Sequence, residues 1–271
     1  MATDRRHNAL RAFVENVGRH TYSGVQELGY VFALLVESLF WLLLGKTRNQ
    51  PVRVSAVFGE AMQIGVQAVP IVSVLSFAVG VMLAIQGIYT LRTFGAESKV
   101  VLGVALAITR EFAPLIVGVL VAGRSGSAIT ARIGTMHESQ EIDALRVIGI
   151  NPVRYLATPV LVAMLIVVPT LTVLGDLMGV LGGGLFTALE LGMSLNAYIE
   201  RTLDVLSVDD IRQGLVKSLV FAVIIALVGV SNGFQVGAGA EGVGRSTTRS
   251  VVLSISAIVL ADMIFTYFLN R

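Results

Sequence analysis

The sequence predicts an all-α integral membrane protein, and three observations lead to this fold class. Apolar residues make up 55% of the 271 residues and charged residues only 14%, whereas about a quarter of an ordinary soluble domain is charged. Long runs with few or no charges recur along the chain. Lysines and arginines gather in alternate connections between those runs, as they do around membrane helices.

Five of the runs are long enough to cross a bilayer as helices, which takes roughly 20 apolar residues. The first and fourth contain no charge, and the second is interrupted only by Arg110 and Glu111. The third contains only Asp176 and the fifth only Asp262. The predicted spans are residues 61–91, 100–123, 155–189, 218–240 and 250–269, which together make one domain, residues 61–271.

Residues 1–60 are predicted to form a separate N-terminal helical region in the cytoplasm and at the membrane surface. The stretch 30–45 is apolar, but it is short for a span and contains Glu37. We therefore expect an interfacial or re-entrant helix there. The basic segment 1–19 is not followed by the apolar core and cleavage site of a signal peptide, so the N-terminus is expected to be retained.

The distribution of basic residues predicts a cytoplasmic N-terminus. With that orientation the loop 190–210 faces outward, where five carboxylates accompany a single arginine, Arg201. Five spans then place the C-terminus outside. The cytoplasmic segments receive thirteen of the 20 basic residues: Arg5, Arg6, Arg11, Arg19, Lys46, Arg48, Arg53, Arg124, Arg132, Arg146, Arg154, Arg245 and Arg249.

Several kinds of site are not expected in this chain. It has no cysteine, which excludes disulfides and thiolate metal sites. Its three histidines are spread without metal-ligand spacing, and its net charge of +2 is too small and too scattered to indicate nucleic-acid binding. Gly45-Lys46-Thr47 resembles the end of a phosphate-binding loop, but Phe40 stands where its first glycine is required.

Three glycines in the third span, Gly175, Gly179 and Gly183, repeat every four residues. Such spacing lets two helix backbones approach closely. It is equally typical of an interface between subunits and of packing within one chain.

Between the second and third spans the sequence predicts a short capped helix, residues 136–148. Thr135 and Glu138 have the spacing of a capping box, and Gly149 followed by Pro152 ends the helix. Acidic residues in its first half and Arg146 in its last turn match the helix dipole.

This helix is either a solvated connector or a contact for a partner protein. A connector needs neither caps nor an apolar side, and the apolar set here must be buried against something. The apolar set is Met136, Ile142, Leu145, Val147 and Ile148. The residues expected at a partner contact are Met136, Glu138, Glu141, Asp143, Leu145 and Arg146.

At several separated motifs the sequence resembles the MlaE family, the permease subunits of bacterial lipid-transporting ABC systems that work with MCE proteins. The resemblance covers roughly residue 50 to the C-terminus. It rests on Gln86-Gly87, Phe94-Gly-Ala-Glu97, Arg110-Glu111-Phe-Ala-Pro114, residues 122–134, residues 141–152 and Gly244-Arg-Ser-Thr-Thr-Arg249.

The resemblance implies a homodimeric permease in the bacterial inner membrane, with residues 136–148 as the coupling helix seated in an ABC ATPase subunit. ATP and magnesium would be bound by that ATPase, and no cofactor by this chain. The loop 190–210 and the C-terminus would be periplasmic, facing an MCE-domain protein, and a small STAS-domain protein is a further partner. Phospholipid is the family's usual cargo.

The adjacent charges Arg110 and Glu111 lie halfway along the second span, where an ion must meet a partner or water. Neighbouring residues diverge by about 100° on a helix, so the two are expected to have different partners. They belong either to an ion-pair network between spans or to a polar patch in a lipid cavity, with Arg110 attracting a phosphate headgroup. The resemblance favours the cavity.

The same cavity could be lined by residues near the outer end of the first span. Gln86 and Tyr89 are its candidate polar contacts, and Ile85 and Ile88 its candidate acyl-chain contacts. Anchoring at the membrane interface is the alternative role of Tyr89.

The leading hypothesis for function is thus an ATP-driven lipid permease subunit. A proton-coupled secondary transporter using Arg110, Glu111, Asp176 and Asp262 is the alternative, although such acids are more often hydrated or paired. A membrane scaffold that only docks a partner is a third possibility.

Overall fold

The computed structural model describes residues 2–45 and 50–269, so Lys46, Thr47, Arg48 and the last two residues lie outside the described ranges. Every regular element within these ranges is helical, which confirms the all-α prediction. In the described part of the chain, six helices are long and apolar enough to cross a membrane.

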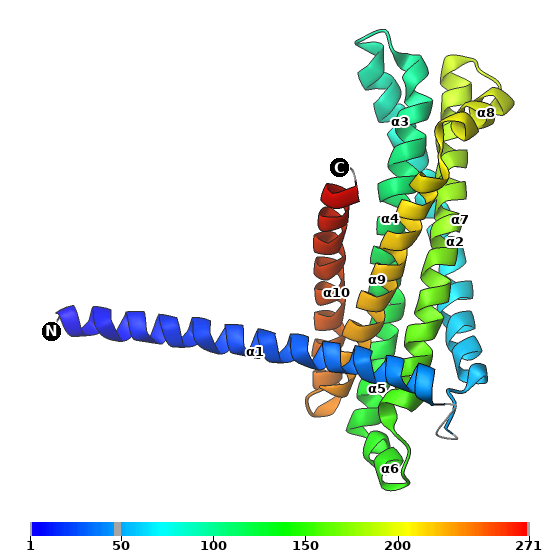
Figure 1. Ribbon diagram of the computed structural model, residues 1–271. Coiled ribbons are helices and arrows are strands. Elements are labelled where there is room, and N and C mark those ends of the chain that lie inside the picture. Colours follow the sequence, from blue (N-terminus) through cyan, green and yellow to red (C-terminus); the bar gives the residue numbers. More distant parts are fainter. Residues whose placement is uncertain (1, 46–49, 270–271) are drawn as a thin grey trace.

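Of the six membrane-length helices, one crosses the other five, which run along a common axis (Figure 1). The short helices α6 and α8 lie at opposite ends of this bundle, which we call the α6 end and the α8 end. The axial segments are α2 (Val54–Arg92), the helical path 97–138, α7 (Thr158–Leu191), α9 (Val208–Phe234) and α10 (Gly239–Leu269); the others are α1 (Ala2–Leu44), α6 (Glu141–Val147) and α8 (Leu195–Val205).

The second axial segment is a single helical path with two π-helical turns, in which the backbone is locally widened. One π-turn contains Arg110 and Glu111, and the other contains Arg124. Pro114, which has no N–H to donate, follows the first. The path comprises η1 (Glu97–Lys99), α3 (Val100–Ala107), η2 (Ile108–Phe112), α4 (Ala113–Val121), η3 (Ala122–Gly126) and α5 (Ser127–Glu138).

The helices differ from the predicted spans at several ends, in most cases because the helix continues past a charged residue. The helix of the first span starts at Val54, inside the predicted N-terminal region. The fourth starts at Val208, where Ser207 and Asp210 form a capping box, and it ends at Phe234. A third π-turn, η4 (Val153–Ala157), precedes α7. The predicted outer loop 190–210 therefore contains α8 and the start of α9.

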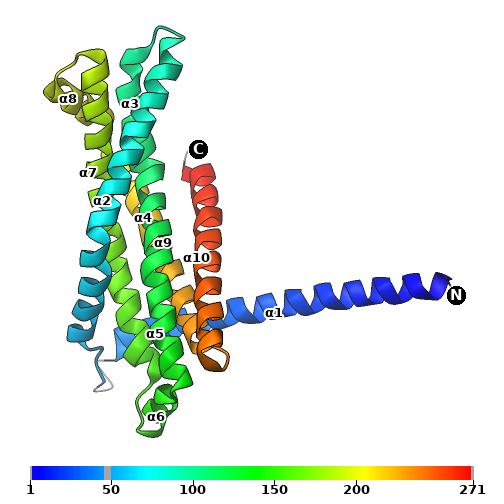
Figure 2. The same ribbon diagram turned by 180° about the vertical axis from the view of Figure 1, so that it is seen from behind.

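Helix α1 is continuous and crosses the bundle near its α6 end (Figure 2). It does not fold back as a re-entrant element would, and its direction across the other helices fits the interfacial alternative. Glu37 lies in the apolar half of α1. Its charge is stabilised there because its carboxylate accepts a hydrogen bond from the Asn151 side chain at 2.7 Å. Arg249 of α10 forms a second link, to Glu27 of α1 at 2.7 Å.

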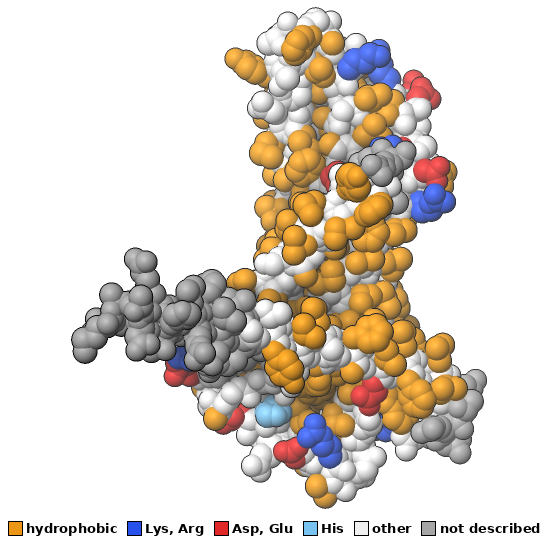
Figure 3. Space-filling view, turned by 60° about the vertical axis from the view of Figure 1, so that its left-hand side comes forward, with side chains coloured by type: hydrophobic (Ala, Val, Ile, Leu, Met, Phe, Trp, Pro, Cys, Tyr) orange, Lys and Arg blue, Asp and Glu red, His pale blue; other side chains and the backbone are white. Residues whose placement is uncertain are grey.

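Apolar side chains cover the middle of the bundle, and charged side chains gather towards its two ends (Figure 3). This is the distribution that a membrane protein requires, because a charge facing hydrocarbon is costly. The axial direction of the bundle is therefore the membrane normal.

Helices α2 and α7 pack closely through glycines. A Cβ atom at Gly80 of α2 would lie only 1.9 Å from the carbonyl oxygen of Gly179 of α7, which is a steric clash. Gly175 and Gly183 likewise face atoms of other helices in the same chain. The predicted glycine repeat therefore serves packing within the chain.

Gly80→Ala is expected to destabilise the protein by about 1–3 kcal/mol, since the new methyl group would force two backbones apart. Gly59→Ala is the matched control on the same helix, because a Cβ there meets nothing within 4 Å. Thermal unfolding of the purified variants in detergent measures the difference. Equal midpoints for the two variants would contradict the close approach.

Candidate functional site

The predicted coupling helix is two helices separated by a turn. Thr135 does not cap a helix, because its hydroxyl donates to the carbonyl of Ala131 at 2.9 Å within α5. Helix α5 continues to Glu138, and Gln140 then has a φ of 61°, which breaks the helix before α6. The capping-box prediction was wrong because a polar residue can also bond back within a helix.

The apolar set of this segment is divided between the core and the surface. Ile142 is buried in the main core, and Met136 packs against that core. Val147 and Ile148, at the end of α6, are 86% and 68% exposed. Leu145 is half-buried. The protein thus holds α6 in place from inside and presents an apolar pair outward.

Exposed charged residues precede that apolar pair at the end of α5 and on α6. Asp143 and Arg146 form an exposed ion pair at 2.9 Å, one turn apart on α6. Glu141 accepts a hydrogen bond from the Ser139 hydroxyl at 2.9 Å, and Glu138 is exposed at the end of α5. Exposed pairs of this kind contribute little to stability, so the charges remain available to another molecule.

The loop after α6 is anchored to α1. The side chain of Asn151 accepts hydrogen bonds from the backbone N–H groups of Val153 and Arg154 and donates to Glu37. The Arg154 guanidinium lies over the Trp41 ring, 5.6 Å from its centre. Residues more than 100 positions apart make this contact, so sequence reasoning had no local signal for it.

At the α8 end, the predicted lipid-contacting residues lie in three different environments: a cavity, the outer surface and the core. Gln86 lines a cavity of about 300 Å³ between α2 and α3. Ile85 and Tyr89 lie on the outer surface of α2, 46% and 73% exposed. Ile88 is only 3% exposed and packs in a core cluster with Val104. Its side chain thus packs inside this chain, whereas it was predicted to contact an acyl chain.

Arg110 is paired across helices with an acid from the predicted outer loop. Its Nε donates to Oδ1 of Asp210 at 2.6 Å. Asp210 is buried, with 3% of its side chain exposed, and it also caps α9 through Ser207. The Arg110 side chain is 36% exposed. As expected, Arg110 and Glu111 have different partners.

Glu111 belongs to a buried cluster centred on Lys217 of α9. Lys217 is fully buried and forms ion pairs with Glu111 and, at 3.0 Å, with Asp262 of α10. It also donates to the Thr266 hydroxyl at 2.9 Å, and that hydroxyl donates to Glu111 at 3.0 Å. These contacts form the ion-pair network that was one of the two alternatives.

Sequence analysis missed Lys217 as a partner. This residue precedes the predicted fourth span by one position, so it lay outside the predicted spans. Helix α9 starts earlier, at Val208, so Lys217 lies within the helix and not before it. A lysine directly before an apolar run, with unpaired acids in other spans, was the available signal.

The two remaining intramembrane acids differ. Asp262 is paired with Lys217, as is usual for an acid inside a span. Asp176 lies in the middle of α7, and its buried Oδ1 has no hydrogen-bond partner among the described residues. No contact in the structure explains Asp176.

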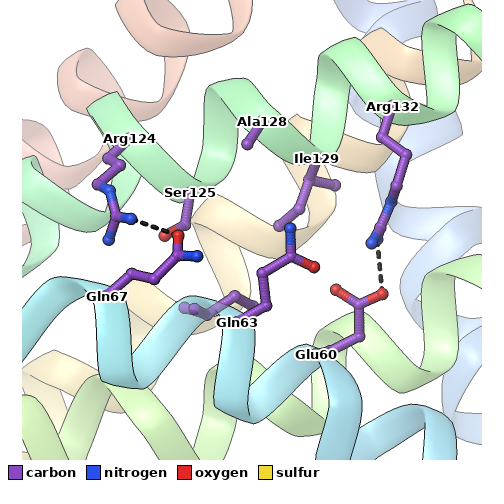
Figure 4. Close-up of a pocket in the computed structure, with 9 residues that line it drawn as sticks. Glu60, Gln63, Gln67, Arg124, Ser125, Ala128, Ile129 and Arg132 are labelled. Carbon is purple, nitrogen blue, oxygen red and sulfur yellow. Dashed lines mark hydrogen bonds and ion pairs between the residues drawn. The ribbon is translucent and has the colours of Figure 1, made fainter.

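A further cavity, of about 170 Å³, lies between α2 and the η3–α5 stretch towards the α6 end (Figure 4). Two cross-helix contacts border it: Arg124 donates to the Gln67 side chain, and Arg132 pairs with Glu60 at 2.6 Å. Gln63 lies between the two contacts. Sequence analysis did not identify this cavity.

Comparisons with known proteins show which family the sequence matches. The model of the family described as Permease MlaE matches residues 57–268. A probable ABC transporter permease protein of Rickettsia typhi is 35% identical over 94% of this chain and 96% of its own length. The intermembrane phospholipid transport system permease protein MlaE of Haemophilus influenzae is 29% identical over 94% of this chain and 96% of its own length. The chloroplastic protein TRIGALACTOSYLDIACYLGLYCEROL 1 of Arabidopsis thaliana is 36% identical over 70% of this chain and 54% of its own length.

Proposed function

Because this chain belongs to the MlaE permease family, and is thus an ABC transporter permease, we propose that it moves phospholipid between the bacterial inner membrane and a periplasmic MCE protein. A separate ATPase subunit supplies the energy. The name of the Haemophilus influenzae relative, which refers to intermembrane phospholipid transport, supports phospholipid as the cargo.

The observation that carries this proposal is the exposed tip of α6. Val147 and Ile148 present apolar surface beside Glu141, Asp143 and Arg146, at the very end of the bundle. Exposed apolar residues with a charged rim are typical of a protein contact. In the proposed complex this tip is seated in the ATPase.

The proposed orientation places the α6 end in the cytoplasm. Basic side chains gather there on the helix ends and connections, while the α8 end carries several acids. The positive-inside rule then places α8 in the periplasm, towards the MCE protein. The basic residues at the α6 end include Arg132, Arg146, Arg154, Arg245 and Arg249, and the acids at the α8 end include Glu97, Glu190 and Glu200.

The route of the conformational signal follows from the continuity of the second axial segment. Ile142 fixes α6 to the core, and α5 runs without a break into the π-turns that hold Arg124 and then Arg110. Helix α1 is tied to the loop after α6 through Glu37. In our proposal, movement of the ATPase at α6 is passed along both connections.

The lipid-contacting surface proposed for transport lies at the α8 end. Ile85 and Tyr89 are exposed on α2, and Gln86 lines the neighbouring cavity with Gly103 of α3. A second copy of the chain would close this surface in the proposed homodimer. The proposed complex also includes a small STAS-domain protein on the cytoplasmic side.

Val147→Asp and Ile148→Asp are expected to abolish co-purification of the ATPase subunit, because a carboxylate would be buried in the apolar contact. Phe94→Asp is the matched control, since Phe94 is 77% exposed at the opposite end of the bundle. Affinity purification after co-expression measures ATPase recovery. Undiminished recovery with both α6 variants would refute docking at this tip.

A further inference from the structure

Two polar helix faces meet in the cavity towards the α6 end. Helix α2 contributes Glu60, Gln63 and Gln67, which recur at the spacing of one helix face. The opposing η3–α5 stretch contributes Arg124 and, two turns later, Arg132. Figure 4 shows these five side chains directed into the same space from the two helices.

The charges around the cavity do not cancel. Arg132 is neutralised by Glu60, whose side chain is only 16% exposed. Arg124 donates to Gln67, which carries no charge, and no carboxylate among the described residues lies within ion-pair distance of it. The cavity thus has one net positive charge and free N–H groups, because a guanidinium has five donors.

The cavity opens at the depth of the lipid headgroups. The charge-free run of α2 begins at Ala61, directly after Glu60, so this part of the helix leaves the hydrocarbon region. Gln63 and Ala128 are exposed at the opening, while Ile64 and Ile129 are buried behind it. A polar opening above apolar side chains suits an amphiphilic ligand.

We propose that this cavity binds the phosphate group of a phospholipid from the bilayer leaflet at the α6 end. Arg124 supplies the unneutralised charge, Arg132 and Gln63 supply further N–H donors, and the acyl chains remain in the surrounding bilayer. Arginine binds phosphate oxygens through paired, charge-assisted hydrogen bonds. The site lies at the opposite end of α2 from the proposed transport surface, so it goes beyond the proposed function.

Lipid retention by the purified full-length chain tests this site without ATP or an ATPase. Phosphatidylglycerol and diacylglycerol with the same acyl chains are offered in detergent, and bound lipid is counted by native mass spectrometry. We expect preferential retention of phosphatidylglycerol, and about tenfold weaker retention by Arg124→Gln, the effect of losing one charge-assisted contact. Arg245→Gln is the control, because Arg245 is exposed at the same end of the bundle and paired with Glu241.

A second variant tests whether weaker lipid retention could result from misfolding of Arg124→Gln. Gln67→Glu keeps Arg124 but places a carboxylate beside it that neutralises its charge. This variant is therefore expected to weaken lipid retention as Arg124→Gln does. Arg124→Lys keeps the positive charge and should retain much of the lipid. Equal retention of both lipids, or equal retention by Arg124→Gln and Arg245→Gln, would overturn the proposal. Binding of inorganic phosphate without any retention of phosphatidylglycerol would assign the cavity to a free anion and also overturn the proposal. None of these results depends on docking at Val147 and Ile148.

Discussion

Lys217→Met is expected to destabilise the protein by about 3–5 kcal/mol, the usual cost of removing one partner from a buried ion pair. The methionine matches the lysine stem in size but leaves Glu111 and Asp262 facing each other without a cation. The Lys217 side chain is fully buried, so its charge is held away from bulk water. Denaturant-induced unfolding of the purified protein in detergent micelles measures this change.

Neutralising the two acids as well provides the control. Lys217→Met combined with Glu111→Gln and Asp262→Asn has no uncompensated charge, so it is expected to recover most of the lost stability. The recovery is non-additive, because the three residues form one network. A triple variant less stable than Lys217→Met alone would show that the cluster is not held together by charge.

Arg110→Met is expected to lower the free energy of unfolding by about 3 kcal/mol. Asp210→Asn is expected to lower it by clearly less. Asp210 is 3% exposed and would lose its cation while remaining buried, whereas Arg110 is 36% exposed and can reach water when its partner is neutral. Ser207 would still donate two hydrogen bonds to Asp210, which limits the loss. The same unfolding measurement compares the two variants.

The same pair separates the two hypotheses for Arg110. If Arg110 acts only in the ion pair, Arg110→Met and Asp210→Asn should leave bound phospholipid unchanged in the purified complex. If it attracts a headgroup, Arg110→Met alone should lower bound phospholipid. Equal stability of the two variants would contradict the asymmetry derived from burial.

The helical fold class and the five axial segments could be predicted from composition and charge, but the helix ends and helix α8 could not. The predicted end of the second span at Gly123 stopped before Arg124, which in the structure continues the helix and faces Gln67. The same error placed Lys217 outside a span. A charge beside an apolar run has the same local pattern whether it meets water or a partner from another helix.

The segment after α5 shows a different reason for error. The spacing of Thr135 and Glu138 is a local signal for a helix start. In the structure the helix instead breaks at Gln140, and Ile142 after the break packs in the core. Tertiary packing thus overrode a capping preference worth about 1 kcal/mol. Glu141, Asp143 and Arg146, three of the residues predicted to contact a partner, nevertheless lie on a short helix, α6.

By itself the sequence determined that the chain belongs in a membrane, that its helices alternate with basic and acidic connections, and that it resembles a permease family. These properties depend on composition and on order along the chain. Only the tertiary structure decided which charges meet: Arg110 with Asp210, Glu111 with Lys217, and Arg132 with Glu60. Such pairs join residues far apart in the chain, and a low-dielectric interior makes each partner necessary to the other.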